Sequence, residues 1–424
     1  MALSLLLNFC WLVSLALASP SELSVDPRGI VSIHRGVSSI PLDNGCEFAG
    51  TITLGGPSTL SYGEKNFYNL GSKQLTAFQL MVDFINRHRC GVELESKRYA
   101  LAMRTFDDQS DKGFTTKIAQ HLTHNSSDVD LLLGGYSSGL TANMAAVANE
   151  SGRLLLAPGA ASTGVFRDRP QAFGALPPTA KYTAQAVQAL AEVAGAKSIA
   201  TLYEDASFTR GACGAIPGLA EQYGLTVTST HQVVAKPEMT DLLPIAQNFT
   251  DENPDVVMTC SYDKGCQSWM EAMQAAEWSP KAQIFTICVG LEAFKDSVGA
   301  NAGYIFGVTP WDQSLNIVDE VTGLSAREFA EIFKNATGDV DVTYHAASAA
   351  SAISIAVQSI EKANTLDEGL LAEHIASSSF ATAYGQISFD SNGQSQAPSL
   401  LIQYDGNNEV QTVFPPEISS GNLL

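Results

Sequence analysis

Residues 131–139 read Leu-Leu-Leu-Gly-Gly-Tyr-Ser-Ser-Gly, and residues 154–163 read Leu-Leu-Leu-Ala-Pro-Gly-Ala-Ala-Ser-Thr. In each stretch a short apolar run, as expected for a strand buried on both faces, leads into glycine, alanine and small hydroxyl residues. Ligands of open α/β sheets bind beyond the carboxyl ends of the strands, where such loops meet. The two stretches therefore predict a parallel sheet with a small polar ligand at its edge.

Strand-like runs and helical periods alternate along most of the chain. We expect strands at 49–54, 100–106, 130–134, 154–157, 198–203, 225–229, 255–259, 282–287, 385–389 and 399–404. We expect helices at 74–87, 115–124, 141–149, 181–193, 209–223, 240–248, 264–276, 344–362 and 368–376. Such alternation is typical of right-handed βαβ units. The predicted fold class is therefore α/β, with two doubly wound parallel-sheet lobes joined by crossover strands and a ligand cleft between them.

The lobe boundaries follow from this order of elements. A leader takes residues 1–18, an N-terminal extension 19–48 and a tail 415–424. The first lobe comprises 49–177 and 308–384, and the second comprises 178–307 and a return segment at 385–414. The chain would then cross between the lobes more than once.

The N-terminus and the charge balance predict a secreted protein, in an extracellular or periplasmic-type compartment. Residues 5–18 are mostly apolar, too short to span a bilayer, and end in an Ala-x-Ala cleavage pattern at Ala16 and Ala18. The net charge is −20, which disfavours nucleic acid and anionic membrane surfaces as partners.

The cysteine and asparagine patterns agree with a secretory route. Removal of Cys10 with the leader leaves six of the seven cysteines, and an even number favours disulfides in a secreted protein. We expect the pairs Cys46–Cys90 and Cys260–Cys266, and the spacing fits no zinc module. N-glycosylation sequons begin at Asn125, Asn149, Asn248 and Asn335. Asp107 and Asp108 follow an expected strand, and we expect them to cap the next turn rather than bind metal.

The order and spacing of several motifs resemble the type I periplasmic-binding fold. This is the leucine/isoleucine/valine-binding protein family, which also includes the ligand-binding regions of eukaryotic receptors. The motifs are at 82–86 (Val-Asp-Phe-Ile-Asn), 106–108 (Phe-Asp-Asp), 134–138, 157–162 and 385–390 (Gly-Gln-Ile-Ser-Phe-Asp). The likeness covers residues 49–414.

The resemblance implies an amino acid or a related carboxylate or amide held between the lobes. A carboxylate needs several convergent donors, such as hydroxyls and the free N–H groups of a helix start. The first-lobe residues that would supply them are Ser137, Ser138, Gly159, Ala160, Ala161 and Ser162. The second-lobe contributions would be Phe208, Tyr262 and Asp263. For Ser138, ligand binding, capping of the following helix, and both together remain open.

One position departs from the family pattern. Amino-acid binders of the family hold the ligand ammonium with a carboxylate after the strand expected at 282–287, and Val289 occupies the matching position here. Because an enclosed ammonium without a counter-charge is costly, a small polar ligand is favoured over an amino acid. Asp263, Asp205 and Glu292 are the candidate substitutes for the carboxylate.

Two other functions remain open. Residues 135–139 fit the Gly-x-Ser-x-Gly nucleophile elbow, so Ser137 could serve a secreted serine hydrolase, with His345 or His374 as base and Asp312 or Asp341 as orienting acid. Neither histidine lies on a loop after the last strand, and we expect no enzyme and no cofactor. The other alternative is an adhesion or interaction module with a vacant cleft, because function resides in the site and not in the fold.

The resemblance also implies a mode of action. The lobes would close over the ligand by hinge motion, and closure would be detected by a membrane transporter or by the membrane part of a receptor. The receptor relatives further imply homodimerisation through one lobe.

Overall fold

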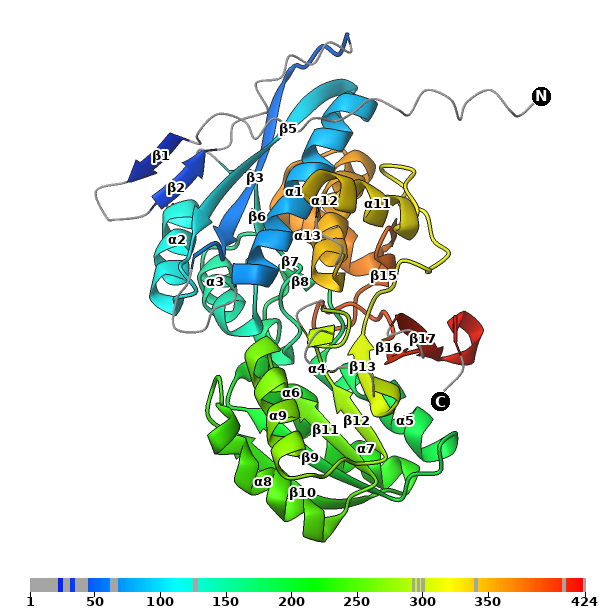
Figure 1. The fold of residues 1–424 in the computed structure, drawn as a ribbon. Coiled ribbons are helices and arrows are strands. Elements are labelled where there is room, and N and C mark those ends of the chain that lie inside the picture. Colours follow the sequence, from blue (N-terminus) through cyan, green and yellow to red (C-terminus); the bar gives the residue numbers. More distant parts are fainter. Residues whose placement is uncertain are drawn as a thin grey trace, which may run out of the picture.

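The computed structural model describes residues 22–25, 31–34, 45–61, 68–124, 129–291, 294–295, 298, 302–338, 342–405 and 409–421. The expected leader, the sequon residue Asn125, and the site candidates Glu292 and Asp341 lie outside these residues. Figure 1 shows the described chain as two α/β lobes, one above the other, with the ends of both sheets directed at the boundary between them.

The first sheet has the strand order β1-β2-β5-β3-β6-β7-β8, with β4 paired to β5. Its strands are β1 (Glu22–Val25), β2 (Val31–His34), β3 (Gly50–Ser58), β4 (Val92–Leu94), β5 (Lys97–Asp107), β6 (Leu131–Leu133), β7 (Leu155–Ala157) and β8 (Ala172–Gly174). The strands from β5 to β8 in this order are parallel to one another. The carboxyl ends of β6 and β7 therefore lie at the same edge, as the two opening stretches of sequence predict.

The helices of the first lobe cover both faces of this sheet. They are α1 (Tyr68–Arg89), α2 (Lys112–His124), α3 (Ser138–Glu150), α11 (Ala326–Thr337), α12 (Tyr344–Ala363) and α13 (Glu368–Ser377). Ile118 of α2 and Met144 of α3 pack against Leu132 on one face. Phe78 of α1 and Ile353 of α12 belong to the core on the other face, and α1 and α12 lie side by side.

The second sheet has the order β10-β9-β11-β12-β13-β16-β17. Its strands are β9 (Ser198–Glu204), β10 (Thr226–Val233), β11 (Val256–Cys260), β12 (Ala282–Phe285), β13 (Ile305–Thr309), β16 (Leu400–Tyr404) and β17 (Val410–Phe414). The first five are parallel, whereas β16 and β17 join antiparallel at the β13 edge. Its helices are α4 (Thr179–Tyr182), α5 (Ala184–Glu192), α6 (Ser207–Gly214), α7 (Ile216–Tyr223), α8 (Met239–Glu252) and α9 (Asp263–Ala275).

The strands of the return segment, residues 385–414, lie in two different sheets. Strands β16 and β17 lie in the second sheet, whereas β15 (Gly385–Ser388) pairs with β14 (Ser379–Thr382) in a separate hairpin. The lobe boundaries at 49–177, 178–307, 308–384 and 385–414 stay a prediction. The predicted helix at 181–193 is interrupted at Thr183, and the one at 209–223 is interrupted at Ala215, two residues before Pro217, which lies in the first turn of α7.

The cysteines form the pairs Cys46–Cys90, Cys213–Cys260 and Cys266–Cys288. The first pair confirms a prediction, and the predicted pair Cys260–Cys266 is wrong. Cys260 of β11 packs with Cys213 of α6 on one face of the second sheet, whereas Cys266 of α9 packs with Cys288 on the opposite face. Only five residues lie between Cys260 and Cys266 in the sequence, but the sheet lies between their side chains.

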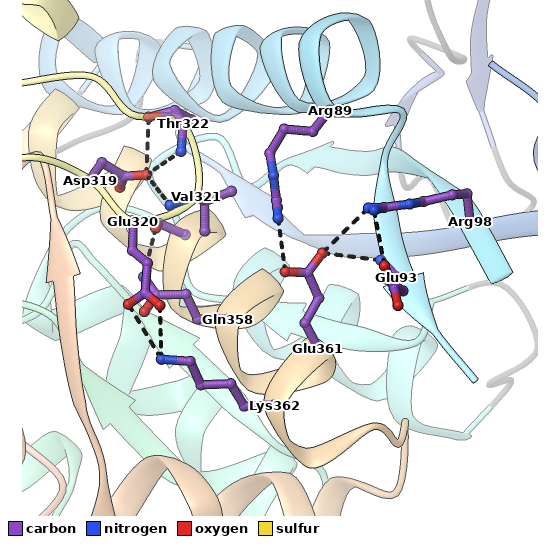
Figure 2. A network of polar contacts seen from close by, with 11 residues as sticks. Arg89, Glu93, Arg98, Asp319, Glu320, Val321, Thr322, Gln358, Glu361 and Lys362 are labelled. Carbon is purple, nitrogen blue, oxygen red and sulfur yellow. Dashed lines mark hydrogen bonds and ion pairs between the residues drawn. The ribbon is translucent and has the colours of Figure 1, made fainter. Parts of the chain in front are cut away.

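A network of ion pairs holds α12 in the first lobe (Figure 2). The Glu361 carboxylate accepts from Arg89 of α1 at 3.0 Å and lies 3.8 Å from Arg98 of β5. It also accepts from the Glu93 backbone N–H at 3.1 Å. Because these partners come from α1, β4 and β5, they fix the C-terminal half of α12 against three elements.

Two carboxylates fix the end of β5. The Asp108 carboxylate, fully buried, accepts from the Thr59 hydroxyl at 3.1 Å and from the Ser110 N–H at 2.9 Å. Asp107 accepts from the Leu60 N–H at 3.1 Å. The expectation that these residues cap a turn is confirmed, and they tie the loops after β3 and β5 together. Burial raises the pKa of the Asp108 carboxyl to about 7.

The Glu361→Gln variant should lower the free energy of unfolding by about 1 kcal/mol, because it removes the charge from a partly buried group with three partners. Glu320→Gln is the matched control, since Glu320 pairs with Lys362 on the exposed side of the same helix and such pairs contribute little. Urea denaturation of both variants gives the comparison, and equal losses would contradict the role assigned to Glu361.

Asp108→Asn should become more stable, relative to the unmodified protein, as the pH rises. A folded-state pKa above the unfolded value means that the stabilisation by protonated Asp108 is complete below about pH 4 and is lost as the pH passes about 7. Asparagine does not ionise, so the difference in unfolding free energy should shift in favour of the variant by about 2 kcal/mol between pH 5 and pH 8. A difference that stays constant with pH in urea denaturation would show that Asp108 titrates normally.

Candidate interlobe ligand site

A cleft lies where the two lobes meet. It is lined by Tyr136, Ser137, Ser138, Gly159, Ala161, Leu176, Tyr182, Phe208, Tyr262, Ile287, Tyr344 and His345. These residues come from the loops after β6 and β7, from α4, α6 and the starts of α3 and α12, and from the segments after β8, β11 and β12. The side chains leave only a narrow space between the lobes.

The first-lobe wall depends on a close approach of two loops. Tyr136 and Gly159 form a parallel backbone bridge beyond the ends of β6 and β7. A Cβ atom at Gly159 would lie 2.4 Å from the Gly135 carbonyl oxygen, a distance that no side chain tolerates. Glycine at position 159 therefore allows the two loops to lie side by side.

The two serines of this wall have different roles. The Ser137 hydroxyl accepts from the Leu140 N–H at 3.3 Å and caps α3. The Ser138 hydroxyl instead accepts from the N–H groups of Ala161 and Ser162, both at 3.1 Å. The capping role considered for Ser138 thus belongs to Ser137, because α3 begins three residues before the predicted start. Ser138 ties the β6 loop to the β7 loop and occupies two N–H groups that were candidates for the ligand.

The second-lobe wall is aromatic and is positioned by a buried glutamate. The Phe208 ring meets the Tyr182 ring edge-on at a centroid distance of 5.2 Å and lies 6.3 Å from the Tyr262 ring. Glu204, buried at the end of β9, accepts from the N–H groups of Tyr262 and Lys236, each at 3.0 Å. It therefore fixes the loop that carries Tyr262.

The structure brings together most of the predicted site residues. Ser137, Ser138, Gly159, Ala161, Phe208 and Tyr262 line the cleft. Ala160 is buried in the core beside α3, and Ser162 lies at the lobe boundary, where its hydroxyl accepts from Ser207 at 3.2 Å. Asp263 begins α9 beside the cleft but does not line it. Ligand contact by any of these residues stays a prediction.

Half of the lining residues were not among the ligand contacts expected from the sequence. Tyr136 lies within residues 131–139 and forms the backbone bridge to Gly159, so it belongs to the same pair of loops as the predicted first-lobe residues. Leu176 and Ile287 follow strands, and Tyr182 ends the short helix α4, without a polar signature. Tyr344 and His345 reach the cleft because α12 packs beside α1, and no local sequence motif predicts this packing.

The lining carries no charged group at neutral pH. Burial raises the pKa of the Tyr262 and Tyr344 hydroxyls well above their usual range. Burial and the nearby Lys73 ammonium lower the pKa of His345 to about 3, so its imidazole is neutral. Burial raises the pKa of the Asp263 carboxyl beside the cleft, although the Lys73 ammonium opposes the shift.

Residues 286–291, the described start of the loop after β12, offer no carboxylate to the cleft. Ile287 lines the cleft, whereas Val289 is buried against Gly307 of β13. Asp205 is exposed and pairs with Arg210. Among the described residues, Asp263 is therefore the remaining candidate for an ammonium partner.

The described residues do not form the hydrolase triad. His345 lines the same cleft as Ser137, but its Nδ1 atom has no hydrogen-bond partner, and a triad histidine is oriented through this atom by a carboxylate. Asp312 accepts from the N–H of Ser314 in its own turn. His374 lies on α13, where its ring meets Phe380.

The part of the chain that the structure describes contains neither a cluster of metal ligands nor a helix that could span a membrane. No group of three or more histidine, cysteine, aspartate or glutamate side chains is arranged to hold a metal ion. None of the described helices combines the length and apolar character needed to cross a membrane.

The fold is similar to that of several solved substrate-binding proteins. The branched-chain amino acid substrate-binding protein LivJ of Streptococcus pneumoniae, in complex with isoleucine, superposes with a TM-score of 0.72 at 17% identity, over 86% of this chain and 100% of its own. The leucine-binding protein LivK of Thermotoga maritima gives 0.70 at 16% identity, over 85% and 97%. A solute-binding protein of Rhodopseudomonas palustris in complex with 4-hydroxybenzoate gives 0.69 at 17% identity, over 84% and 93%.

A protein-family model also matches most of the chain. A model described as "Periplasmic binding protein" matches residues 51–409, nearly the whole span over which the motifs suggested this fold. The similar structures named above are binding proteins and not enzymes. The chain therefore belongs to the periplasmic binding protein family of type I.

Proposed function

We propose that this protein binds a small organic carboxylate in the interlobe cleft and closes over it by hinge motion. The first-lobe wall supports this. Helix α3 begins at the cleft, and the N–H groups of a first helical turn lack acceptors within the helix and favour an anion. The moving units would be the lobes as the sequence divides them, 49–177 with 308–384 and 178–307 with 385–414.

The ligand we favour is an aromatic carboxylate without an ammonium group. The observation that carries this choice is the uncharged lining, which holds Tyr136, Tyr182, Phe208, Tyr262 and Tyr344 but no carboxylate. Aromatic rings pack well against one another edge-on or offset, whereas an enclosed ammonium requires a counter-charge. Of the two ligand classes seen in the similar structures, amino acids and 4-hydroxybenzoate, the second suits this lining better.

We further propose that the protein acts outside the cytoplasm after removal of residues 1–18. The sequon residues Asn149, Asn248 and Asn335 are exposed on α3, α8 and α11, which is compatible with glycosylation there. The closed form would be detected by a membrane transporter or by a receptor partner, and homodimerisation is a further expectation of the receptor relatives.

Thermal unfolding in the presence of candidate ligands tests the ligand class. Benzoate or 4-hydroxybenzoate at about a hundred times its Kd should add about 2.7 kcal/mol of stability, which raises the Tm by several degrees. Leucine and isoleucine should leave the Tm unchanged. Tyr262→Ala should weaken the response, whereas Tyr203→Ala, on β9 and outside the cleft lining, should not.

The alternatives predict other results. A response to leucine but not to benzoate would overturn the aromatic ligand and make Asp263 the ammonium partner. A Tm that no tested carboxylate changes would contradict the solute-binding role and favour an interaction module with a vacant cleft.

A further inference from the structure

Some buried polar atoms of the cleft lining have no hydrogen-bond partner among the described residues, and one of them belongs to a histidine. His345 is the second residue of α12, lines the cleft and is 3% exposed, and its Nδ1 atom makes no hydrogen bond. A buried polar group without a partner is destabilising and is rare in folded proteins. In a cleft that holds a ligand, such an atom is a candidate contact for it.

The imidazole is held in place by its neighbours. It stacks on the Tyr344 ring at a centroid distance of 3.8 Å and meets the Tyr136 ring edge-on at 5.1 Å. One turn later the Ser348 hydroxyl donates to the Pro158 carbonyl at 2.9 Å, which ties α12 to the β7 loop. The Glu361 network anchors the other end of the helix (Figure 2). These contacts hold the imidazole in the cleft wall, where its Nδ1 atom is buried.

Because the imidazole of His345 is neutral, it binds a ligand group by hydrogen bonding and not by charge. An uncharged ring nitrogen can accept or donate one hydrogen bond, depending on the tautomer. It offers no charge to an ammonium or to a second carboxylate. A hydroxyl group suits both tautomers because it donates and accepts.

We infer that His345 is a specificity-determining residue, whose Nδ1 atom binds a ring hydroxyl and makes the cleft prefer hydroxylated aromatic acids to their unsubstituted analogues. This inference rests on the proposed function and narrows its ligand class. A site built around a buried polar group rejects a ligand that leaves this group unpaired.

Calorimetric titration of the whole protein with benzoate, 3-hydroxybenzoate and 4-hydroxybenzoate tests the inference. The unmodified protein should bind at least one hydroxybenzoate about tenfold more tightly than benzoate, as expected for one additional hydrogen bond in a buried site. His345→Phe should abolish this preference and retain benzoate binding. His345→Asn keeps an amide atom near the position of Nδ1 and should retain part of the preference.

A second histidine provides the matched control. His231 on β10 also has an unpartnered ring nitrogen and an edge-on contact, to Phe249 at 5.5 Å, but it does not line the cleft. His231→Phe should leave the preference for hydroxybenzoate unchanged. Circular dichroism verifies that each variant is folded, and if His345→Phe is not, the comparison of His345→Asn with the unmodified protein still tests the inference.

The outcomes separate the inference from the proposed function. Equal binding of benzoate and both hydroxybenzoates by the unmodified protein would overturn the role of His345 and leave the aromatic ligand class in place. The same holds if folded His345→Phe keeps the preference. Failure of all three acids to bind would overturn the proposed ligand class and the inference with it.

Discussion

The close contact between the loops after β6 and β7 is the constraint on which the cleft depends. Gly159 permits the contact, and the Ser138 hydroxyl secures it by accepting two N–H groups of the β7 loop. Because both strands are parallel and end at one edge, this contact forms a continuous wall from Tyr136 to Ala161. The start of α3, the cap at Ser137 and the contact between Ser348 and Pro158 all follow from the position of this wall.

The other walls come from parts of the chain that are distant in sequence. Helix α12 contributes Tyr344 and His345 only because it packs beside α1, more than two hundred residues earlier. The second lobe contributes rings whose loop is held by Glu204. The result is a cleft with hydrogen-bonding groups in the first-lobe loops and aromatic rings from both lobes, and its chemistry depends on the whole fold.

The sequence predicted many of the buried strands and the loops that follow them, because their signals are local, but it did not predict β8, β13 and β17. Leu131–Leu133 and Leu155–Ala157 are apolar runs that end in glycine or proline. Helix α11 was missed although Ser325 and Glu328 form a capping box before an amphipathic segment. The Cys260–Cys266 pairing failed because closeness in sequence does not reveal which face of a sheet a side chain occupies. Residues such as His345 could be assigned to the site only from the tertiary structure, because packing between helices brings them there.

The arrangement of the disulfides has a consequence for partial unfolding. In the second lobe, Cys213–Cys260 fastens α6 to one face of the sheet and Cys266–Cys288 fastens α9 to the other. Neither helix can leave the sheet while these bonds are intact. In the first lobe, Cys46–Cys90 joins the segment before β3 to the end of α1, so α2, α3 and α12 are held by packing, hydrogen bonds and ion pairs. In an oxidising compartment, local opening should therefore begin in the first lobe, and the second lobe should act as the fixed template on which the cleft re-forms.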